Sequence, residues 1–526
     1  MKKRNHGARR LTAMIACGIL YAGGVIAEPA SSPAKRPNIL WIGFDQLRPD
    51  AIGCYGNRIC QTPNLDRLAR QGVRFSNAYT TCCLCSPARA SMLTGKFAFK
   101  HGMGTNCDLY HSLAPELPHP EMLLHRRLTA LGYQTGFVGK WHVGTKKGAD
   151  AYGFEGLGPA GYGGIEKHPE FLNYLRDANL SFGSVKNPIF GNATNKTLLG
   201  GEWDGPLETT PAYFVAERTI GLLNKYARQG EPFFLDCQFW GPHPAYLPSR
   251  EFLRRHDRTA LKPWVNWNDD LKGKPASVAR FRAEFYRQLP KDWSGWQELV
   301  GLYYDYITMF DQQLGRILDR LQELGLAENT MVVVEADHGD MIGGHGLFDK
   351  GFMYQEAYRI PLIVRWPARC RQPVVSDELV YNMDIFPTIL EALGQPDPTL
   401  DGKSFLEVLD GKRLTASRDA IYLEFHGIRY LYSQRALVTR DGFKYIFNAG
   451  DFDEFYDLNK DPGELSNRIE AAEYRETVAR LRERLKRAAA ETKDPIQDDI
   501  AKMFGDWENL SGQFEAAGMI HGQGKK

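Results

Sequence analysis

The 526-residue sequence lacks several features that would assign it to a broad class at once. Beyond its first 27 residues there is no run of 18 uncharged apolar residues, so no transmembrane anchor is expected. It also lacks a surplus of basic residues: without residues 1–27 it holds 60 Lys and Arg against 63 Asp and Glu, a formal charge of −3. Nucleic-acid binders usually carry a basic surplus, so we expect no nucleic-acid partner.

Two absences narrow the meaning of the cysteine-rich stretch TTCCLCSPARASMLTG at 80–95. No second Cys/His pair lies nearby at ligand spacing, which argues against a zinc knot. Cys83 and Arg89 have the Cys-x5-Arg spacing of thiol phosphatases, but LCSPA contains no glycine to line a phosphate cradle. Cys82 and Cys83 are therefore expected to be buried thiols or half of a disulfide. Cys54 and Cys60 are close enough to pair, and the sequence leaves the connectivity open.

The amino-terminal segment has the anatomy of an export signal. Residues 1–10 carry five Lys or Arg and no acid, residues 11–27 are apolar or small, and Val25-Ile26-Ala27 fits a signal-peptidase site. We expect a signal peptide at 1–27, a linker at 28–37 and an exported protein, either periplasmic or secreted. Cys17 offers a less favoured lipoprotein alternative, because its apolar lead-in is only six residues long.

Apolar runs alternate with helical patterns along the chain. The apolar run at 37–44 is followed by Asp45, and the segments 231–244 and 329–340 are apolar runs that end in polar residues. Helix, glycine and strand patterns follow one another at 62–79 and 124–144. This order predicts an α/β fold: a large mixed, mainly parallel sheet between helices, with ligands at its carboxyl edge. Residues 145–230 are rich in Gly, Asn and Pro and predict long loops over the site.

The pattern changes after residue 412. Residues 435–458 predict a hairpin meander with an Asp-Gly turn, and a charged helix is expected at about 471–491. We therefore expect a catalytic domain at 38–412 and a smaller carboxyl-terminal α+β subdomain with an antiparallel sheet at 413–526.

The segment CSPARASMLTG, which begins at Cys85, resembles the signature of the type I sulfatases, in the alkaline-phosphatase-like superfamily. The resemblance implies that Cys85 is oxidised to formylglycine (3-oxoalanine) by a formylglycine-generating or anaerobic sulfatase-maturing enzyme. The aldehyde hydrates to a diol; one oxygen attacks sulfur and the other later loses its proton as sulfate leaves. Cys83 departs from the family pattern, which more often has a small non-cysteine residue there, and it would compete for oxidation.

The other motifs of that family follow in order over residues 38 to about 465. The resemblance implies that GFDQ and EADHGD place a metal on Asp45, Gln46, Asp337 and His338, together with an oxygen of the converted Cys85. Oxygen-rich ligation favours Ca²⁺ over Mg²⁺ or Mn²⁺. Gln46 replaces the commoner second aspartate and removes one negative charge from the site.

The remaining site residues are also carried over by resemblance. VGKWHVG supplies Lys140 and His142, WGPHP supplies His243, and GLFDKGF supplies Lys350. The family implies that Arg89 holds the diol and the aspartates, and that Lys140 bridges diol and sulfate. His142 accepts the diol proton; His243 and Lys350 bind sulfate, and one of them protonates the leaving oxygen. The expected catalytic set is Cys85, Arg89, Lys140, His142, His243 and Lys350.

Three functions compete at this point. The first is hydrolysis of a sulfate ester, either an aryl sulfate or a sulfated carbohydrate. The second is a phosphonate or phosphate-ester hydrolase on the same scaffold, a branch that shares the Asp-Gln pair. The third is a non-catalytic polyanion-binding protein, if Cys85 is never oxidised. Aromatic residues in 151–175 are candidates for stacking on sugar rings or for ordinary loop packing.

Overall fold

The structure is a computed structural model that describes residues 36–497, apart from 110–111, 113, 193–196, 286–287 and 429–430. The expected signal peptide, the lipoprotein alternative at Cys17 and nearly all of the expected linker lie outside these residues. Among the residues described, no helix is long and apolar enough to cross a membrane.

Nine of the described strands form the central sheet, in the order β11-β2-β10-β8-β1-β7-β3-β4, with β9 paired to β2. Most neighbours are parallel, whereas β10 runs antiparallel to β2 and β8. The predicted mixed, mainly parallel sheet is confirmed. Its strands are β1 (Asn38–Asp45), β2 (Val73–Tyr79), β3 (Gln134–Gly139), β4 (Glu155–Leu157), β7 (Phe233–Pro242), β8 (Thr330–Ala336), β9 (Arg359–Ile360), β10 (Leu362–Arg365) and β11 (Val374–Tyr381).

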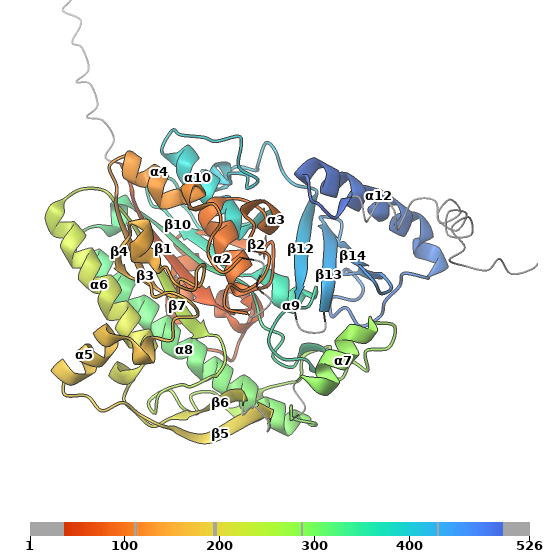
Figure 1. Ribbon diagram of the computed structural model, residues 1–526, viewed down its shortest axis with the longest axis horizontal. Helices are drawn as coiled ribbons and strands as arrows, with labels where there is room; N and C mark the ends of the chain where they lie inside the picture. The colour runs from red at the N-terminus through yellow and green to blue at the C-terminus, as the bar shows by residue number, and fades with distance from the viewer. Residues whose placement is uncertain are drawn as a thin grey trace, which may run out of the picture. The chain divides into compact units, whose positions relative to one another are not determined.

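Helices cover both faces of this sheet. In Figure 1, α6 and α8 lie on one side of the sheet, and α2, α4 and α10 lie on the other. The helices are α1 (Pro63–Ala69), α2 (Cys85–Thr94), α3 (Ala98–His101), α4 (Leu124–Ala130), α5 (Pro169–Asp177), α6 (Pro211–Gln229), α7 (Ala276–Glu284), α8 (Trp293–Glu323), α9 (Gln355–Tyr358), α10 (Ile385–Ala392), α11 (Leu406–Leu409) and α12 (Arg475–Thr492).

Strand β1 lies in the middle of the sheet and is buried along its whole length. It is parallel to β7 on one side and to β8 on the other, so the three strands end at the same edge. Asp45 closes β1, Asp337 follows β8, and His243 follows β7. The alternation of strands and helices therefore brings three sequence-distant polar side chains to one edge of the sheet.

The expectation of loops over 145–230 is wrong for much of that stretch. The structure contains α5, a hairpin of β5 (Val185–Asn192) and β6 (Thr197–Trp203), and the 19-residue helix α6. The Thr210 side chain accepts a hydrogen bond from the backbone of Tyr213, and Pro211 occupies the first turn. Capping and an apolar stripe that packs on the sheet form a helix here despite the surrounding Gly, Asn and Pro.

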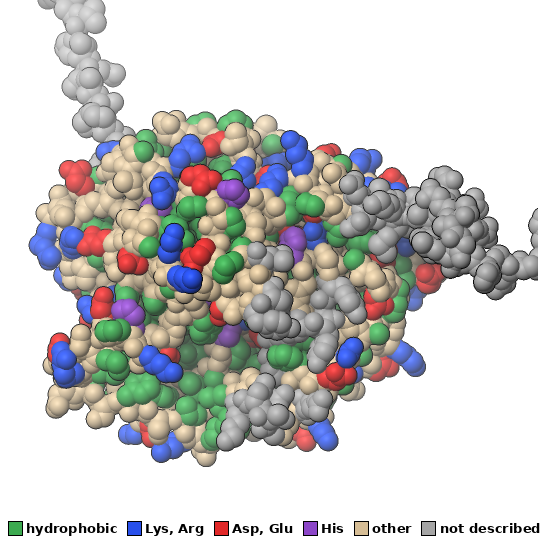
Figure 2. All heavy atoms as spheres, in the orientation of Figure 1, with side chains coloured by type: hydrophobic (Ala, Val, Ile, Leu, Met, Phe, Trp, Pro, Cys, Tyr) green, Lys and Arg blue, Asp and Glu red, His purple; other side chains and the backbone are tan. Residues whose placement is uncertain are grey.

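The carboxyl-terminal meander is confirmed. A four-stranded antiparallel sheet has the order β12 (Ala420–Ile428), β13 (Leu431–Thr439), β14 (Phe443–Asn448) and β15 (Glu454–Asp457), and α12 packs against it. The backbone N–H of Glu424 in β12 donates to the carbonyl oxygen of Thr81, so this sheet is tied to the segment that precedes Cys85. On the face drawn in Figure 2, acidic and basic side chains are interspersed rather than gathered by sign.

Gly43 in β1 leaves space for a buried polar side chain from the neighbouring strand. A Cβ atom at this position would lie 2.1 Å from Oε1 of Gln238. The Gln238 amide cannot swing away freely, because its Nε2 donates to Asp236 at 2.7 Å and its Oε1 accepts from Arg89 at 3.0 Å. The smallest residue in β1 therefore sets the position of a side chain that contacts Arg89.

Gly43→Ala should lower the free energy of unfolding by about 1–3 kcal/mol, because the added methyl overpacks a buried site. The measurement is equilibrium urea denaturation. The matched control is Gly221→Ala in α6, where nothing lies within 4 Å; it should raise stability by about 0.5–1 kcal/mol. Gln238→Ala added to Gly43→Ala should recover part of the loss. A stable Gly43→Ala protein would contradict the packing described.

Candidate functional site

The carboxyl edge of the sheet gathers four potential metal ligands. Ligand atoms of Asp45, Cys85, Asp337 and His338 all lie within 4.8 Å of one another, and all four side chains are buried. Cys85 is the first residue of α2, and its Sγ is 3.3 Å from Nε2 of His338 and 3.8 Å from Oδ1 of Asp45. Two carboxylates and an imidazole facing one point form a donor set that fits a divalent cation.

Gln46 lies beside this group in a left-handed backbone conformation, with φ at 66°. Its backbone N–H donates to Oδ1 of Asp337 at 3.1 Å. Its amide oxygen accepts from Nζ of Lys350 at 2.7 Å, and its amide nitrogen donates to Asp349 at 3.3 Å. The oxygen keeps a second lone pair, so its bond to Lys350 leaves it able to coordinate a cation.

Two buried cations balance the two carboxylates. Nε of Arg89 donates to Oδ2 of Asp337 at 3.0 Å, while NH2 lies 4.0 Å from Asp45. Lys140 forms a fully buried ion pair with Asp45. Arg89 also donates to the backbone oxygen of Lys140 at 2.9 Å. Buried charges persist only when they are paired, and these four groups pair with one another, while NH2 of Arg89 has no hydrogen-bond partner among the described residues.

A 270 Å³ cavity opens onto Cys85. Nζ of Lys350 lies 2.7 Å from Nε2 of His243, whose Nδ1 is 2.6 Å from the backbone oxygen of Pro244. Tyr162 lies between the basic residues: its ring is 4.2 Å from Nζ of Lys140 and its hydroxyl is 3.3 Å from Nδ1 of His243. The cavity wall includes Cys85, Asn106, Asp108, His142, Tyr162, Leu198, His243, Asp349, Lys350 and Ile428.

The charges around Cys85 shift its pKa and those of its neighbours. Burial raises the pKa of the Cys85 thiol, but Lys140, Lys350 and His338 overcome this and hold it well below its usual range. Burial likewise raises the pKa of Asp45, and nearby cations, chiefly Lys140, bring it down to about 2. Burial lowers the pKa of His338, but the charge of Asp337 raises it to about 9. The field at residue 85 therefore favours negative charge.

The first turn of α2 adds to that field. The helix starts at Cys85 and runs for ten residues, so the positive end of its dipole lies at residue 85. The backbone N–H of Ser86 donates to Asn106 at 3.0 Å, and the Ser86 hydroxyl donates to the backbone oxygen of His142 at 2.6 Å. These bonds fix the helix start against the two loops that form the cavity wall.

The structure brings together every site residue expected from the sequence. It also adds residues that the sequence did not indicate: Asp108, whose Oδ1 is 3.2 Å from Nε2 of His142, and Gln238 and Asp349. Asp108 stands in a loop without periodicity, so no pattern marked it. Tyr162, one of the aromatic residues considered for sugar stacking, packs beside Lys140. The eight described cysteines are free, which leaves Cys82 and Cys83 as buried thiols and gives no disulfide between Cys54 and Cys60.

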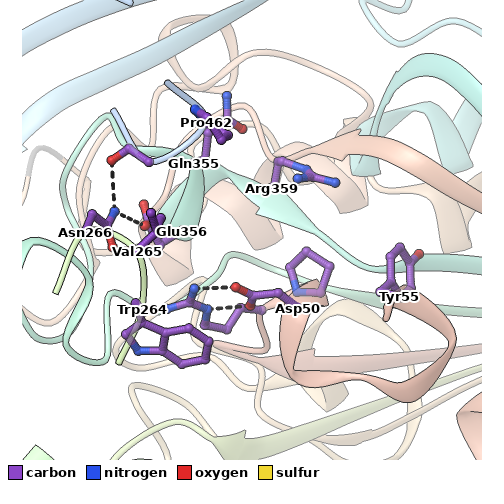
Figure 3. A pocket seen from close by; sticks show the side chains of 12 residues that line it. Asp50, Tyr55, Trp264, Val265, Asn266, Gln355, Glu356, Arg359 and Pro462 are labelled. Carbon is purple, nitrogen blue, oxygen red and sulfur yellow. Dashed lines mark hydrogen bonds and ion pairs between the residues drawn. The ribbon is translucent and has the colours of Figure 1, made fainter. Parts of the chain in front are cut away.

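Residues that line a second cavity, of 210 Å³, hold the loop that follows His338 (Figure 3). Arg48, paired there with Asp50, donates to the backbone oxygens of residues 340 and 341. Trp264, which lines the same cavity, donates to the backbone oxygen of residue 342. Three successive carbonyl groups are thus held from one side, which stabilises the segment between His338 and Lys350.

Sequence profiles of known families match most of the chain. The family described as "Sulfatase" matches residues 37–395, and the family described as "N-sulphoglucosamine sulphohydrolase, C-terminal" matches residues 343–491. An N-acetylglucosamine-6-O-sulfatase of Bacteroides thetaiotaomicron is 26% identical to this chain, and the match covers 90% of each protein.

Solved structures share the fold. A phosphonate monoester hydrolase of Agrobacterium radiobacter superposes with a TM-score of 0.73 at 24% identity, over 87% of this chain and 96% of that chain. A protein solved with its substrate D-glucosamine-2-N,6-O-disulfate superposes with a TM-score of 0.68 at 24% identity, over 88% and 99% of the two chains. Because the sulfatase profile spans more than half of the sequence, the chain belongs to the type I sulfatase family of the alkaline-phosphatase-like superfamily and is a sulfuric ester hydrolase.

Proposed function

We propose that this protein hydrolyses a sulfate ester of a carbohydrate, using a formylglycine made from Cys85 and a divalent cation, with Ca²⁺ favoured. The observation that carries the proposal is the position of Cys85: it starts α2, faces three basic side chains and lies beside two carboxylates and His338. When formed, the formylglycine hydrate supplies a nucleophilic oxygen and a second hydroxyl that can be deprotonated. Export and a maturation enzyme remain part of the same proposal.

A sulfated glycan is favoured over a simple aryl sulfate. The N-acetylglucosamine-6-O-sulfatase and the protein solved with a disulfated glucosamine both act on sulfated hexosamines. The cavity combines apolar wall residues, such as Leu198 and Ile428, with the polar groups of Asn106 and Asp108. A sugar ring presents hydroxyls beside apolar faces, so this mixture suits it.

The side chains of the site would have different roles toward the sulfate group. Asp45, Gln46, Asp337 and His338 would hold the cation together with an oxygen on residue 85. Arg89 keeps the carboxylates in place, because it donates to Asp337 and lies near Asp45. Lys140 and Lys350 offset charge on the nonbridging oxygens, where charge develops during the reaction.

The leaving oxygen needs a proton, and the contacts of His243 indicate its source. Nδ1 of His243 faces the backbone oxygen of Pro244, an acceptor, so Nδ1 carries hydrogen. Nε2 then accepts from Nζ of Lys350. In this arrangement Lys350 carries the hydrogen between the two side chains. Burial lowers the pKa of Lys350, but Asp349 and the other nearby anions raise it above its usual range, so the proton stays on Lys350 until negative charge develops on the leaving oxygen. We therefore infer that Lys350 protonates the leaving oxygen and that His243 positions it.

A second candidate function is hydrolysis of a phosphonate or phosphate ester. Gln46 favours it, because the neutral amide leaves more positive field for an anionic group, and the fold is shared with a phosphonate monoester hydrolase. Rates on aryl sulfate and aryl phosphonate esters with the same leaving group separate the two. Sulfate hydrolysis should be the faster reaction by at least tenfold in kcat/KM; the reverse order would favour the alternative.

Cys85→Ala should lower kcat/KM by a factor on the order of 10⁴ or more while the fold is retained, because the nucleophile is removed. Peptide mass analysis of the wild-type protein should find an aldehyde in place of the Cys85 thiol. Cys83→Ala, two residues away and equally buried, is the matched control and should keep its activity. An inactive, folded Cys83→Ala protein would show that the nucleophile is misassigned, and an unmodified Cys85 would favour polyanion binding alone.

Removal of the metal should abolish turnover, and Ca²⁺ should restore it better than Zn²⁺, because most of the proposed ligands are oxygens. The second readout is the thermal unfolding midpoint. At 100 times its Kd, a ligand that binds only the folded state adds about 2.7 kcal/mol of stability. Asp45→Asn should remove this Ca²⁺-dependent gain, whereas Asp177→Asn on the exposed side of α5 should keep it. Full activity in metal-free protein would disprove the metal site.

Gln46→Asp should tighten metal binding and slow hydrolysis of a phosphate monoester more than that of a sulfate monoester. The added charge lies beside the incoming anion, and at an effective dielectric near 20 it is worth on the order of a few kcal/mol before screening. The phosphate monoester carries more negative charge than the sulfate monoester, so its kcat/KM should fall by the larger factor. The measurement compares kcat/KM for both esters and the Ca²⁺ affinity. Equal losses with unchanged affinity would place residue 46 outside the metal shell.

A further inference from the structure

Three consecutive residues, Asn106, Cys107 and Asp108, join the start of α2 to His142. Asn106 accepts from the backbone N–H of Ser86 at 3.0 Å, and the backbone N–H of Cys107 donates to the Ser86 hydroxyl at 3.1 Å. Sγ of Cys107 donates to the backbone oxygen of His142 at 3.5 Å. Asp108 then reaches the His142 ring itself. One short segment thus positions both the residue that follows Cys85 and the nearby histidine.

The imidazole ring of His142 is buried, with 1% of the residue exposed. Tyr162 packs against it edge-on, with ring centres 5.5 Å apart at 84°. The backbone oxygen of His142 accepts from Ser86 and Cys107. With the backbone and one side of the ring fixed, a hydrogen bond to one ring nitrogen suffices to decide which nitrogen carries the proton.

The two ring nitrogens have different surroundings. Nε2 lies 3.2 Å from Oδ1 of Asp108, whereas buried Nδ1 has no hydrogen-bond partner among the described residues. A carboxylate only accepts, so Asp108 requires hydrogen on Nε2. The hydrogen bond from His142 lowers the pKa of Asp108 and thereby favours its ionised form. In the neutral ring the lone pair is then on Nδ1, which becomes the basic atom.

We propose that Asp108 is a positioning residue that sets the tautomer of His142, with hydrogen on Nε2 and the basic lone pair on Nδ1. The inference rests on the proposed function and on the role that the family resemblance implies for His142, which is to take a proton from a hydroxyl on residue 85. The O–H bond of that hydroxyl would break, the proton would move to Nδ1, and the electron pair left on the oxygen would restore the carbonyl as sulfate leaves. The positive charge on the ring is offset by the Asp108 carboxylate. A carboxylate behind a histidine base has this orienting and stabilising effect in serine hydrolases.

Asp108 is 37% exposed on its side chain and lines the cavity, so it is also placed to contact substrate. The two roles predict different kinetics. A residue that orients the base changes kcat and leaves KM nearly constant, whereas a residue that binds the leaving group changes KM by a factor that depends on the substrate. The expected loss is smaller than for a fully buried carboxylate, because water can reach this side chain.

The test compares Asp108→Asn, Asp108→Glu and the exposed control Asp177→Asn. Asp108→Asn removes the charge that offsets the protonated ring and should lower kcat by about 10–100-fold with KM changed less than about threefold, whereas Asp108→Glu should restore a measurable part of kcat. Asp177→Asn should match the wild type. A change confined to KM, or no change in kcat, would overturn the proposal.

A second readout is independent of turnover. In protein labelled with ¹⁵N-histidine and free of substrate, the His142 ring should show hydrogen on Nε2, with the signal assigned by its loss in His142→Gln. Asp108→Leu, which removes the acceptor for the Nε2 hydrogen, should lower the share of the ring with hydrogen on Nε2. If the wild-type ring carries hydrogen on Nδ1, the proposal is wrong even if the enzyme is active. If the tautomer is as stated but no sulfate ester is hydrolysed, the proposed function fails instead.

Discussion

The guanidinium group of Arg89 is the contact on which the rest of the site depends. Two buried carboxylates, Asp45 and Asp337, stand at the ends of neighbouring strands and repel each other. Arg89 donates to one through Nε, lies 4.0 Å from the other, and binds Gln238 and the backbone of Lys140 through NH1. Burial lowers the pKa of Arg89, but Asp337 and Asp45 outweigh this and raise it, so the guanidinium stays charged. That charge acts with Lys140 near Asp45 and with His338 near Asp337 to favour the ionised form of two carboxylates in a buried site.

The position of Arg89 also determines where Cys85 lies. Both residues belong to α2 and lie one turn apart on the same face. The helix therefore places both the guanidinium and the thiol beside the carboxylates. Gly43 and Gln238 also help to position Arg89. Because Gly43 in β1 has no side chain, there is room for the Gln238 amide, which accepts a hydrogen bond from NH1 of Arg89. A packing detail in the middle of the sheet is thereby linked to the geometry at its edge.

The sequence predicted the sheet and the main site residues for different physical reasons. Apolar runs that end in a polar residue, as β1 ends in Asp45, identify buried parallel strands and place their ends at one edge. The site residues in the longer motif CSPARASMLTG were predicted from its resemblance to the signature of the type I sulfatases. Helix α6 was missed because glycine and proline around it outweighed the Thr210 cap and the apolar spacing. Asp108 was not predictable, since its role depends on a contact across 34 residues that no local pattern encodes.

The neutral side chain at position 46 explains how Lys350 stays available to substrate. Nζ of Lys350 donates to the Gln46 amide oxygen and lies 3.2 Å from Asp349, so one carboxylate neighbours it. A second carboxylate at position 46 would pair with Lys350 and with the cation at once, and it would cancel positive charge where the sulfate group enters. In the proposed metal site the amide oxygen would serve as a ligand without that effect, because the amide has a dipole but no net charge. The residue that departs from the family pattern thus leaves the field of Lys350 directed at the anion.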